Sequence, residues 1–324
     1  MLTKEIFNIK SDDEFKFLCL KVFKFQFENN PVYRNFCELL NRNPENVQEI
    51  INIPFLPIEF FKSKKIVSVN KVAESIFTSS GTTGSTTSKH FVTDLEVYEN
   101  SFKKAFHQFY GEPSDYTILA LLPSYLERTG SSLIYMVDSL IKDSINPDSG
   151  FYLNNLSELS EKLEALDKGG KKIFLIGVSF ALLDLIEISQ FSLTNTVVME
   201  TGGMKGRRKE MIREELHEVL KNGFGVKKIH SEYGMTELLS QAYSYGDGIF
   251  KCPNWMKILI RDPEDALTFL PQNKTGGINV IDLANINSCS FIATQDLGRI
   301  KNDKIEILGR FDNSDIRGCN LLIL

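Results

Sequence analysis

Short apolar runs alternate with amphipathic helical patterns from residue 116 to residue 229, and this alternation constrains the fold more than any other feature of the sequence. Alternation of this kind predicts an α/β protein with a mainly parallel sheet and helices on its faces. Ligands of such sheets bind beyond the carboxyl ends of the strands. The expected elements are strand 116–122, helix 131–142, helix 156–166, strand 172–176, helix 181–188, strand 196–199, helix 207–221 and strand 226–229.

The segments on either side of this region have different patterns. Ser11 and Glu14 form a capping box before an apolar helical pattern of about four turns, and Asn30-Pro31 begins a second helix that extends to Leu40. Past residue 251 the pattern changes to short strands, expected at 256–260, 278–282, 290–293 and 304–308. We therefore predict an N-terminal helical region (1–75), an α/β core (76–250), and a smaller β-rich lobe (251–324).

A dense block of hydroxyl and glycine residues follows a strand expected at 75–78, and a helix capped by residues 93–96 comes after it. Glycine lets backbone N–H groups approach a ligand closely, and hydroxyl donors with a lysine suit phosphate oxygens. The residue before the lysine is Ser88 rather than glycine, so the block is not a P-loop of the ATPase kind. A solvated linker is the alternative reading. The candidate phosphate-binding residues are Ser79, Ser80, Gly81, Thr82, Thr83, Gly84 and Lys89.

Composition excludes several other classes of protein. The net charge of −5 argues against a nucleic-acid groove. The five cysteines show no CxxC pair and the four histidines show no metal-ligand spacing, so we expect reduced thiols and no transition metal held by the protein. No run approaches the ~18 apolar residues of a membrane span and the first residues lack a signal-peptide core. These features predict a cytoplasmic protein.

Further motifs follow the hydroxyl-rich block in a characteristic order. They are SEYGMTE at 231–237, DLGR at 296–299, GRFD at 309–312 and IRG at 316–318. Over residues 76–318 this series resembles the adenylate-forming superfamily of acyl-CoA synthetases, luciferases and adenylation domains. Within it the chain is similar to the acyl-protein synthetase (LuxE) family, related to phenylacetate-CoA ligases. PFLP at 54–57 with Phe61-Lys62, and LPSYLER at 122–128 with SSL at 131–133, support that narrower resemblance.

The resemblance implies the fold of an adenylate-forming large domain and a reaction in two steps. A carboxylic acid, expected to be a fatty acid, would react with ATP and Mg²⁺ to form an acyl-adenylate, and the acyl group would then pass to a thiol. Residues matching the family's motifs would take specific roles. Ser79–Gly84 and Lys89 would hold phosphates, Glu237 would bind Mg²⁺, and Thr236 would contact phosphate. Tyr233 would stack on adenine, and the segment Thr201-Gly202-Gly203 would lie along the purine. Asp296 would bind the ribose, and Arg310 would contact the nucleotide. The 76–250 core would thus bind the nucleotide and the acyl group.

The chain departs from the superfamily at its C-terminus. It stops at Leu324, so the resemblance implies that the small C-terminal domain and its catalytic lysine are essentially absent. Lys89, another lysine or a partner would then assist. The LuxE family is thought to pass its acyl group to one of its own cysteines, and Cys319 is the candidate here, with an acyl reductase as the protein partner. The alternative reading of Cys319 is a small apolar residue before a final strand.

Three other functions remain open from the sequence. One is an acyl-CoA ligase of the phenylacetate type, and another is a nucleotide-binding subunit without catalysis. The third comes from Gly177-Val178-Ser179-Phe180, which resembles the segment lining the acyl pocket of adenylating enzymes but also nearly fits the G-x-S-x-G nucleophile elbow of serine hydrolases. His217, on an expected helix, and His230 make no clear triad with Ser179.

Overall fold

The computed structural model describes residues 2–79, 86–122, 130–153, 155–202, 208 and 211–310. Ser80 to Gly84, Gly203 and Cys319 therefore lie outside the described residues. The chain forms two compact units, one of residues Ala73–Pro253 and one of Met1–Val72 with Asn254–Leu324. The functional division at residues 75 and 250 remains a prediction, because it states which segment binds which ligand.

Five parallel strands in the order β5-β4-β6-β7-β8 form the centre of the Ala73–Pro253 unit. Every residue of β4 and β6 is buried, as expected for strands covered on both faces. Two antiparallel strands, β9 and β10, extend the sheet beyond β8. The predicted α/β fold class is confirmed. The bounds are β4 (Thr117–Leu121), β5 (Gly150–Tyr152), β6 (Ile173–Val178), β7 (Thr196–Thr201), β8 (His230–Tyr233), β9 (Ala242–Ser244) and β10 (Ile249–Lys251).

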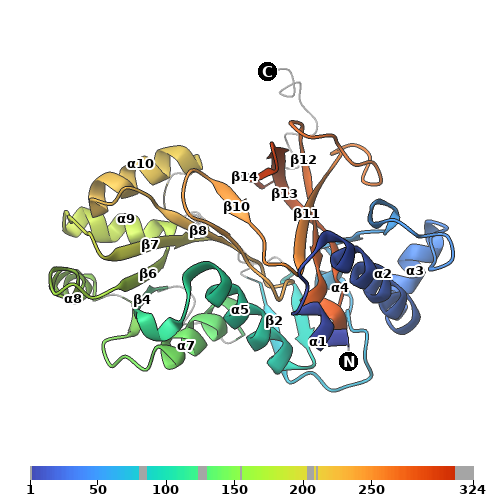
Figure 1. Ribbon diagram of the computed structural model, residues 1–324, viewed down its shortest axis with the longest axis horizontal. Helices are drawn as coiled ribbons and strands as arrows, with labels where there is room; N and C mark the ends of the chain where they lie inside the picture. Colours follow the sequence, from blue (N-terminus) through green and yellow to red (C-terminus); the bar gives the residue numbers. More distant parts are fainter. Residues whose placement is uncertain are drawn as a thin grey trace. The chain divides into compact units, whose positions relative to one another are not determined.

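Helices cover both faces of these parallel strands. Figure 1 shows α9 and α10 on one face and α5 and α7 on the other. Helices α9 and α10 approach closely at Gly223, where a Cβ would lie 2.6 Å from Ile186 Cβ, so only glycine fits. The bounds are α5 (Leu95–Tyr110), η2 (Pro113–Asp115), α7 (Ser132–Ser144), α8 (Leu156–Lys168), α9 (Ser179–Ile188) and α10 (Arg213–Phe224).

A separate hairpin of the same unit flanks the hydroxyl-rich block. It pairs β2 (Ser75–Thr78) with β3 (Lys89–Val92) in antiparallel register, with Thr78 opposite Lys89. The strand expected at 75–78 is confirmed. Asp94 then caps α5 by accepting a hydrogen bond from Val97 N, so the helix begins one residue after its cap.

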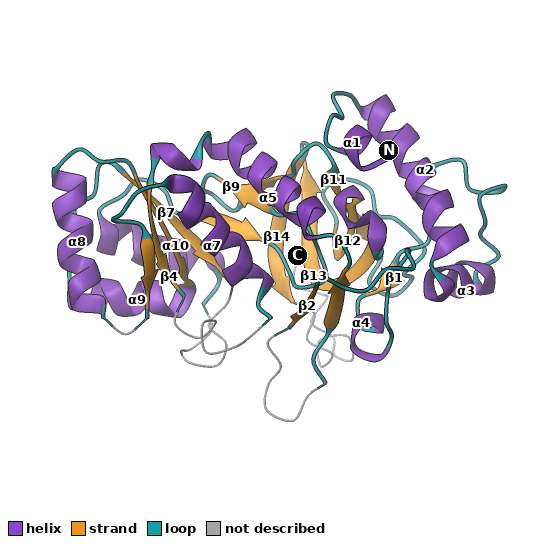
Figure 2. Cartoon of the chain, turned by 90° about the horizontal axis from the view of Figure 1, so that it is seen from below, coloured by secondary structure: helices purple, strands orange, loops and turns teal. Residues whose placement is uncertain are grey.

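The second unit combines the N-terminal helices with an antiparallel sheet, β11-β12-β13-β14, to which β1 adds in parallel (Figure 2). Gln26 joins the two halves of this unit, because its amide donates to the Asn285 and Ile286 carbonyls and accepts from Ser290 N. The bounds are α1 (Leu2–Ile6), α2 (Asp12–Asn29), α3 (Pro31–Leu39), η1 (Ile50–Asn52), β1 (Leu56–Pro57), α4 (Phe60–Ser63), β11 (Met256–Arg261), β12 (Thr275–Asp282), η3 (Leu283–Asn287), β13 (Phe291–Lys301) and β14 (Lys304–Arg310).

The sequence placed one strand of the core wrongly. It predicted a strand at 226–229, whereas β8 occupies His230–Tyr233. Strand β8 has few apolar residues, and its side chains form polar contacts rather than part of the apolar core. An apolar pattern therefore does not reveal it. Helix α10 also begins at Arg213 rather than at residue 207. No helix in the described parts of the chain is long and apolar enough to cross a membrane.

Candidate functional site

The described candidate residues of the Ala73–Pro253 unit lie at the carboxyl ends of β7 and β8 and at the β2–β3 hairpin. Gly202 directly follows β7, and Tyr233 is the last residue of β8. Thr236 and Glu237 lie in the tight turn that follows, which Leu238 N closes by donating to Met235 O at 3.1 Å. Ser79 and Lys89 stand at the two ends of the hydroxyl-rich loop.

A buried histidine connects the hairpin to the Thr236–Glu237 turn. His90 Nδ1 lies 2.8 Å from the Thr236 carbonyl oxygen, and because a carbonyl only accepts, Nδ1 carries the proton. His90 is 1% exposed and is the neighbour of the exposed Lys89 on β3. This contact holds strand β3, which follows the hydroxyl-rich block, against the turn within the SEYGMTE motif. Sequence reasoning missed His90, although its place directly after Lys89 was a signal.

The base of the hydroxyl-rich loop is closed by backbone and hydroxyl contacts. Ser79 N donates to Ser88 O at 3.1 Å, and the Ser79 hydroxyl accepts from Ser88 N at 2.9 Å. Thr78 N donates to Gly130 O at 2.8 Å, where Gly130 has a φ of +86°. Ser79 therefore holds the two ends of the loop together. Its phosphate-binding role, like that of Lys89, remains a prediction.

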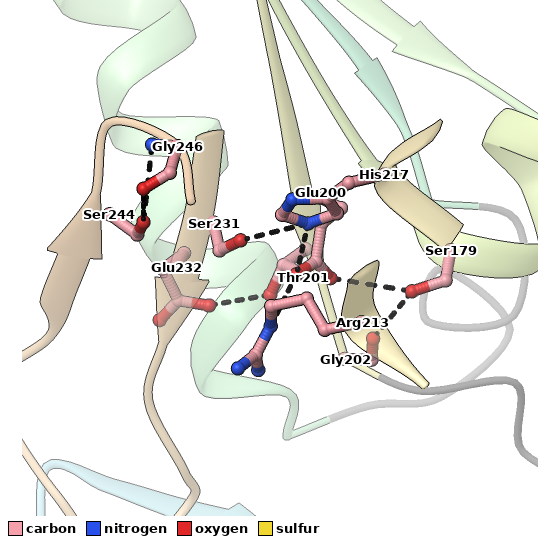
Figure 3. A network of polar contacts seen from close by, with 10 residues as sticks. All are labelled: Ser179, Glu200, Thr201, Gly202, Arg213, His217, Ser231, Glu232, Ser244 and Gly246. Carbon is pink, nitrogen blue, oxygen red and sulfur yellow. Dashed lines mark hydrogen bonds and ion pairs between the residues drawn. The ribbon is translucent and has the colours of Figure 1, made fainter. Parts of the chain in front are cut away.

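A hydrogen bond between side chains joins the carboxyl ends of β7 and β8. Thr201 is opposite Glu232 in the parallel register, and its hydroxyl donates to the Glu232 carboxyl group (Figure 3). The Ser179 hydroxyl donates to the Gly202 carbonyl at 2.8 Å. A Cβ at Gly234 would lie 2.4 Å from Glu232 Oε1, so the glycine after Tyr233 makes room for this carboxyl group.

A charged cluster lies beside this hydrogen bond. Glu200, 6% exposed, has His217 Nε2 at 3.5 Å and Arg213 Nε at 3.7 Å, and Ser231 Oγ contacts His217 Nε2 at 3.4 Å (Figure 3). Burial acts to raise the pKa of Glu200, but His217, Arg213 and Ser231 together outweigh burial and lower it. His217 therefore serves Glu200 and makes no triad with Ser179, whose hydroxyl is bound to Gly202. These contacts disfavour the hydrolase alternative.

Glu232 has the opposite electrostatic environment. Burial, with a smaller contribution from the charge of Glu200, raises the pKa of Glu232 to about 7, although the Thr201 hydrogen bond acts to lower it. Sequence reasoning named Thr201 only as part of the segment expected along the purine, and it missed Glu232 and the contact between the two. The signal for Glu232 was its position directly before Tyr233. The ring of that neighbour, Tyr233, packs edge-on against Phe250.

The two candidate nucleotide contacts of the other unit are neighbours. Asp296 on β13 is opposite Arg310 on β14, and Arg310 Nε lies 3.7 Å from Asp296 Oδ1. The Arg310 side chain is 86% exposed, whereas that of Asp296 is 14% exposed. The Asp296 carboxylate can accept hydrogen bonds from hydroxyl groups, and the exposed Arg310 guanidinium can contact phosphate.

The described residues contain no cluster of three or more His, Cys, Asp or Glu side chains that could hold a metal ion. Mg²⁺ does not need such a cluster, because it is usually bound by one or two carboxylates together with substrate phosphates and water. Glu237, 6% exposed and held in the turn beside Thr236, has the oxygen donor that this chemistry requires. The residues present therefore fit a magnesium ion that arrives with ATP.

Comparisons with known proteins find similarity to an acyl-protein synthetase family and to proteins named as fatty-acid ligases. Residues 7–97 match the family model of acyl-protein synthetase, LuxE. A long-chain-fatty-acid–luciferin-component ligase from Vibrio harveyi is 23% identical over 326 residues, covering 92% of this chain and 84% of that protein. A protein of the same name from Photorhabdus luminescens is 36% identical over 70 residues, covering 21% of this chain and 60% of its own length.

Solved structures agree with the fold. A 2-hydroxyisobutyryl-CoA ligase in complex with 2-HIB-AMP and CoA has a TM-score of 0.68 at 13% identity, covering 94% of this chain and 72% of its own. ATP-bound MatB from Rhodopseudomonas palustris has a TM-score of 0.54 at 17% identity, covering 75% of this chain and 50% of its own. The fold expected from the resemblance, that of adenylate-forming ligases, is confirmed.

Proposed function

The chain is related to the acyl-protein synthetases of the LuxE family, and from that relation we propose that it is an ATP-dependent acid–thiol ligase. In the first step a carboxylate oxygen attacks the α-phosphorus of ATP, the bond from that phosphorus to the bridging oxygen breaks, and pyrophosphate leaves. In the second step a thiolate attacks the acyl carbonyl carbon and AMP leaves.

The observation that supports this proposal most is the contact between His90 and Thr236. Activation of a carboxylate requires the phosphates, the metal and the reacting carboxylate to be held together. The 2.8 Å hydrogen bond places the strand carrying Lys89 against the turn carrying Thr236 and Glu237. This contact between segments more than 140 positions apart supports one shared site for the residues proposed to bind phosphate and magnesium.

Each residue has a proposed role in this reaction. Lys89 and the loop after Ser79 bind the β- and γ-phosphates, and Thr236 contacts phosphate. Glu237 holds Mg²⁺, which when bound offsets the negative charge that the carboxylate must approach. Tyr233 and Gly202 position the adenine, Asp296 accepts from the ribose hydroxyls, and Arg310 contacts the nucleotide.

The acid, the thiol and the partner form the finer part of the proposal. We propose a long-chain fatty acid, as the name of the Vibrio harveyi relative suggests, with Cys319 as the acyl acceptor and an acyl reductase as the cytoplasmic partner that consumes the thioester. Transfer to CoA is the second candidate, and the complex of the structural relative with CoA favours it.

Hydroxylamine trapping tests the first step. The protein is incubated with ATP, Mg²⁺, hydroxylamine and a panel of carboxylates, and we expect hydroxamate with long-chain fatty acids. No hydroxamate with any acid would leave a nucleotide-binding subunit without catalysis as the better assignment. Intact mass after incubation without hydroxylamine tests the second step. A single acyl adduct that Cys319→Ser abolishes supports self-acylation, whereas acyl-CoA formed without an adduct supports the second candidate.

A further inference from the structure

We propose that Thr201 and Glu232 are positioning residues, whose hydrogen bond sets the spacing of the two segments that enclose the adenine. This inference rests on the proposed function, because that function assigns adenine contact to Gly202 and Tyr233. The Thr201–Glu232 pair touches neither the reacting atoms nor the phosphates in the proposed site. Its effect is therefore expected on nucleotide binding rather than on the chemical step.

The position of the pair in the sheet is the first support. Thr201 is the last residue of β7, and the β7–β8 register ends at the pairing of Thr201 with Glu232. Gly202 and Tyr233 come directly after these two residues. The side-chain hydrogen bond therefore joins the last paired residues of the two strands. The next residue in each segment, Gly202 or Tyr233, is expected to contact the purine.

Contacts on either side restrict both segments further. The Ser179 hydroxyl, at the start of α9, donates to the Gly202 carbonyl at 2.8 Å and so fixes the direction of that peptide. Glu232 Oε1 occupies the space that a side chain at position 234 would need. The carboxyl group thus contacts the Thr201 hydroxyl (Figure 3) and also lies against Gly234, the residue before the turn that Leu238 N closes on Met235 O.

The charges around Glu232 give the pair a dependence on pH. Glu200, the residue before Thr201 on β7, contributes a negative charge nearby. Tyr243 on β9 is opposite Glu232 in the register, and Arg213 and His217 of α10 contact Glu200 instead. Burial and Glu200 together raise the pKa of Glu232 to about 7. Ionisation above that pH adds a second negative charge to the site, so we expect weaker ATP binding there.

The strand offers a matched control at its other end. Thr196 is the first residue of β7, and its hydroxyl donates to the Asp167 carboxylate at 2.8 Å. Thr196→Val and Thr201→Val therefore remove the same kind of hydrogen bond from the same strand. Thr201→Ser keeps the hydroxyl donor, and Glu232→Gln keeps an oxygen that accepts from Thr201 but no longer ionises.

The experiment measures the KM for ATP, kcat and the Kd for ATP by calorimetry between pH 6 and pH 8.5. Loss of one buried hydrogen bond corresponds to roughly five- to tenfold in an equilibrium. We expect Thr201→Val to raise the KM and the Kd by about that factor, with kcat within about twofold of wild type. Thr201→Ser should restore binding, and Thr196→Val should leave both constants unchanged. The KM of wild type should rise through pH 7, and that of Glu232→Gln should not.

Equal KM values for Thr201→Val and Thr196→Val, or a wild-type pH profile in Glu232→Gln, would overturn this inference. Other outcomes would overturn the proposed function independently of this inference. A wild-type protein that binds ATP but forms no hydroxamate overturns the function alone, and the Kd values of the variants still decide the role of the pair. A wild-type protein that does not bind ATP overturns both.

Discussion

The two ends of strand β7 hold a carboxyl group in opposite ways. At the amino end, Asp167 accepts from Thr194 N, Asn195 N and the Thr196 hydroxyl, at 3.0, 2.8 and 2.8 Å. Burial acts to raise the pKa of Asp167, but these donors outweigh burial and lower it. At the carboxyl end, Glu232 accepts from the Thr201 hydroxyl beside the negative charge of Glu200, and its pKa is raised to about 7.

The difference supports the proposal that the amino end of β7 serves the fold and its carboxyl end serves a ligand. Asp167 has enough donors to stay ionised, so it stabilises the connection that leads into β7. The surroundings of Glu232 disfavour its ionised form, unlike those of a structural carboxylate. Ionisable groups with pKa values shifted in this way are concentrated at functional sites. Carboxyl ends of parallel strands are where ligands of α/β sheets bind. The contrast can be tested by variants that affect one end and leave the other intact.

The largest effect is expected from Glu237→Gln, in the turn after β8. Removing one charged magnesium ligand should cost about 3–4 kcal/mol of transition-state stabilisation, which is roughly 10²–10³-fold in carboxylate-dependent pyrophosphate release. Glutamine keeps the size and polarity of the side chain, so the free energy of unfolding should change little. Pyrophosphate release and urea unfolding measure the two quantities. Turnover near that of wild type would remove Glu237 from the metal site.

Asp167→Asn should show the reverse pattern. Asparagine would place an NH₂ group where a carboxylate oxygen now accepts from backbone and hydroxyl donors. Donors would then face a donor, and the lost hydrogen bonds should cost about 2–3 kcal/mol of stability. The KM for ATP and kcat of the folded protein should stay close to wild type, because no nucleotide-contacting segment is attached to this end. Urea unfolding and steady-state kinetics on the same preparation check both statements. A raised KM without lost stability would break the contrast.

The pH dependence of stability should also separate the ends. Folding raises the pKa of Glu232 from 4.5 to about 7, so the folded state binds the proton more tightly and the free energy of unfolding falls as pH rises between these values. Folding lowers the pKa of Asp167 below 3.8, so its contribution is already complete at pH 5 and is lost only in stronger acid. Between pH 5 and pH 8, Glu232→Gln should therefore remove a decline in the free energy of unfolding of about 2–3 kcal/mol that Asp167→Asn retains. Urea unfolding at several pH values measures it.

The long apolar strands of the core could be predicted, whereas the polar strand β8 and the short strands β5, β9 and β10 could not. Strands β4 and β6 are buried along their whole length, so their apolar runs identified them. Strand β8 has the sequence His-Ser-Glu-Tyr, and the sequence pattern predicted a strand at residues 226–229 instead. Its place in the sheet depends on pairing with β7, which is a long-range contact that no local pattern encodes.

The candidate site divides in the same way. The resemblance predicts roles for Thr236 and Glu237, which stay predictions, and the structure places both residues in one turn. The resemblance did not predict the contacts of His90 and Thr201, because their partners, Thr236 and Glu232, lie far away in the sequence. Nor could spacing show that Arg310 stands opposite Asp296, since that pairing depends on the register of β13 with β14. Residues that position others are recognised by their contacts, and contacts appear only after folding.

The smallest effect is expected from Ser179→Ala, which also separates ligation from hydrolysis. The Ser179 hydroxyl is 2% exposed and donates to the Gly202 carbonyl, so it is engaged in structure rather than available for attack. Loss of this bond should cost about 1 kcal/mol of stability and raise the KM for ATP by a few fold, with kcat retained. A serine nucleophile would instead lose its covalent step entirely and with it almost all turnover. Steady-state kinetics of Ser179→Ala, with Ser244→Ala as a control that removes a buried hydroxyl from β9, distinguish these results. If Ser179→Ala alone abolishes turnover while leaving ATP binding intact, the carboxyl end of β7 serves a nucleophile on α9, and the assignment of its neighbour Gly202 to the purine fails.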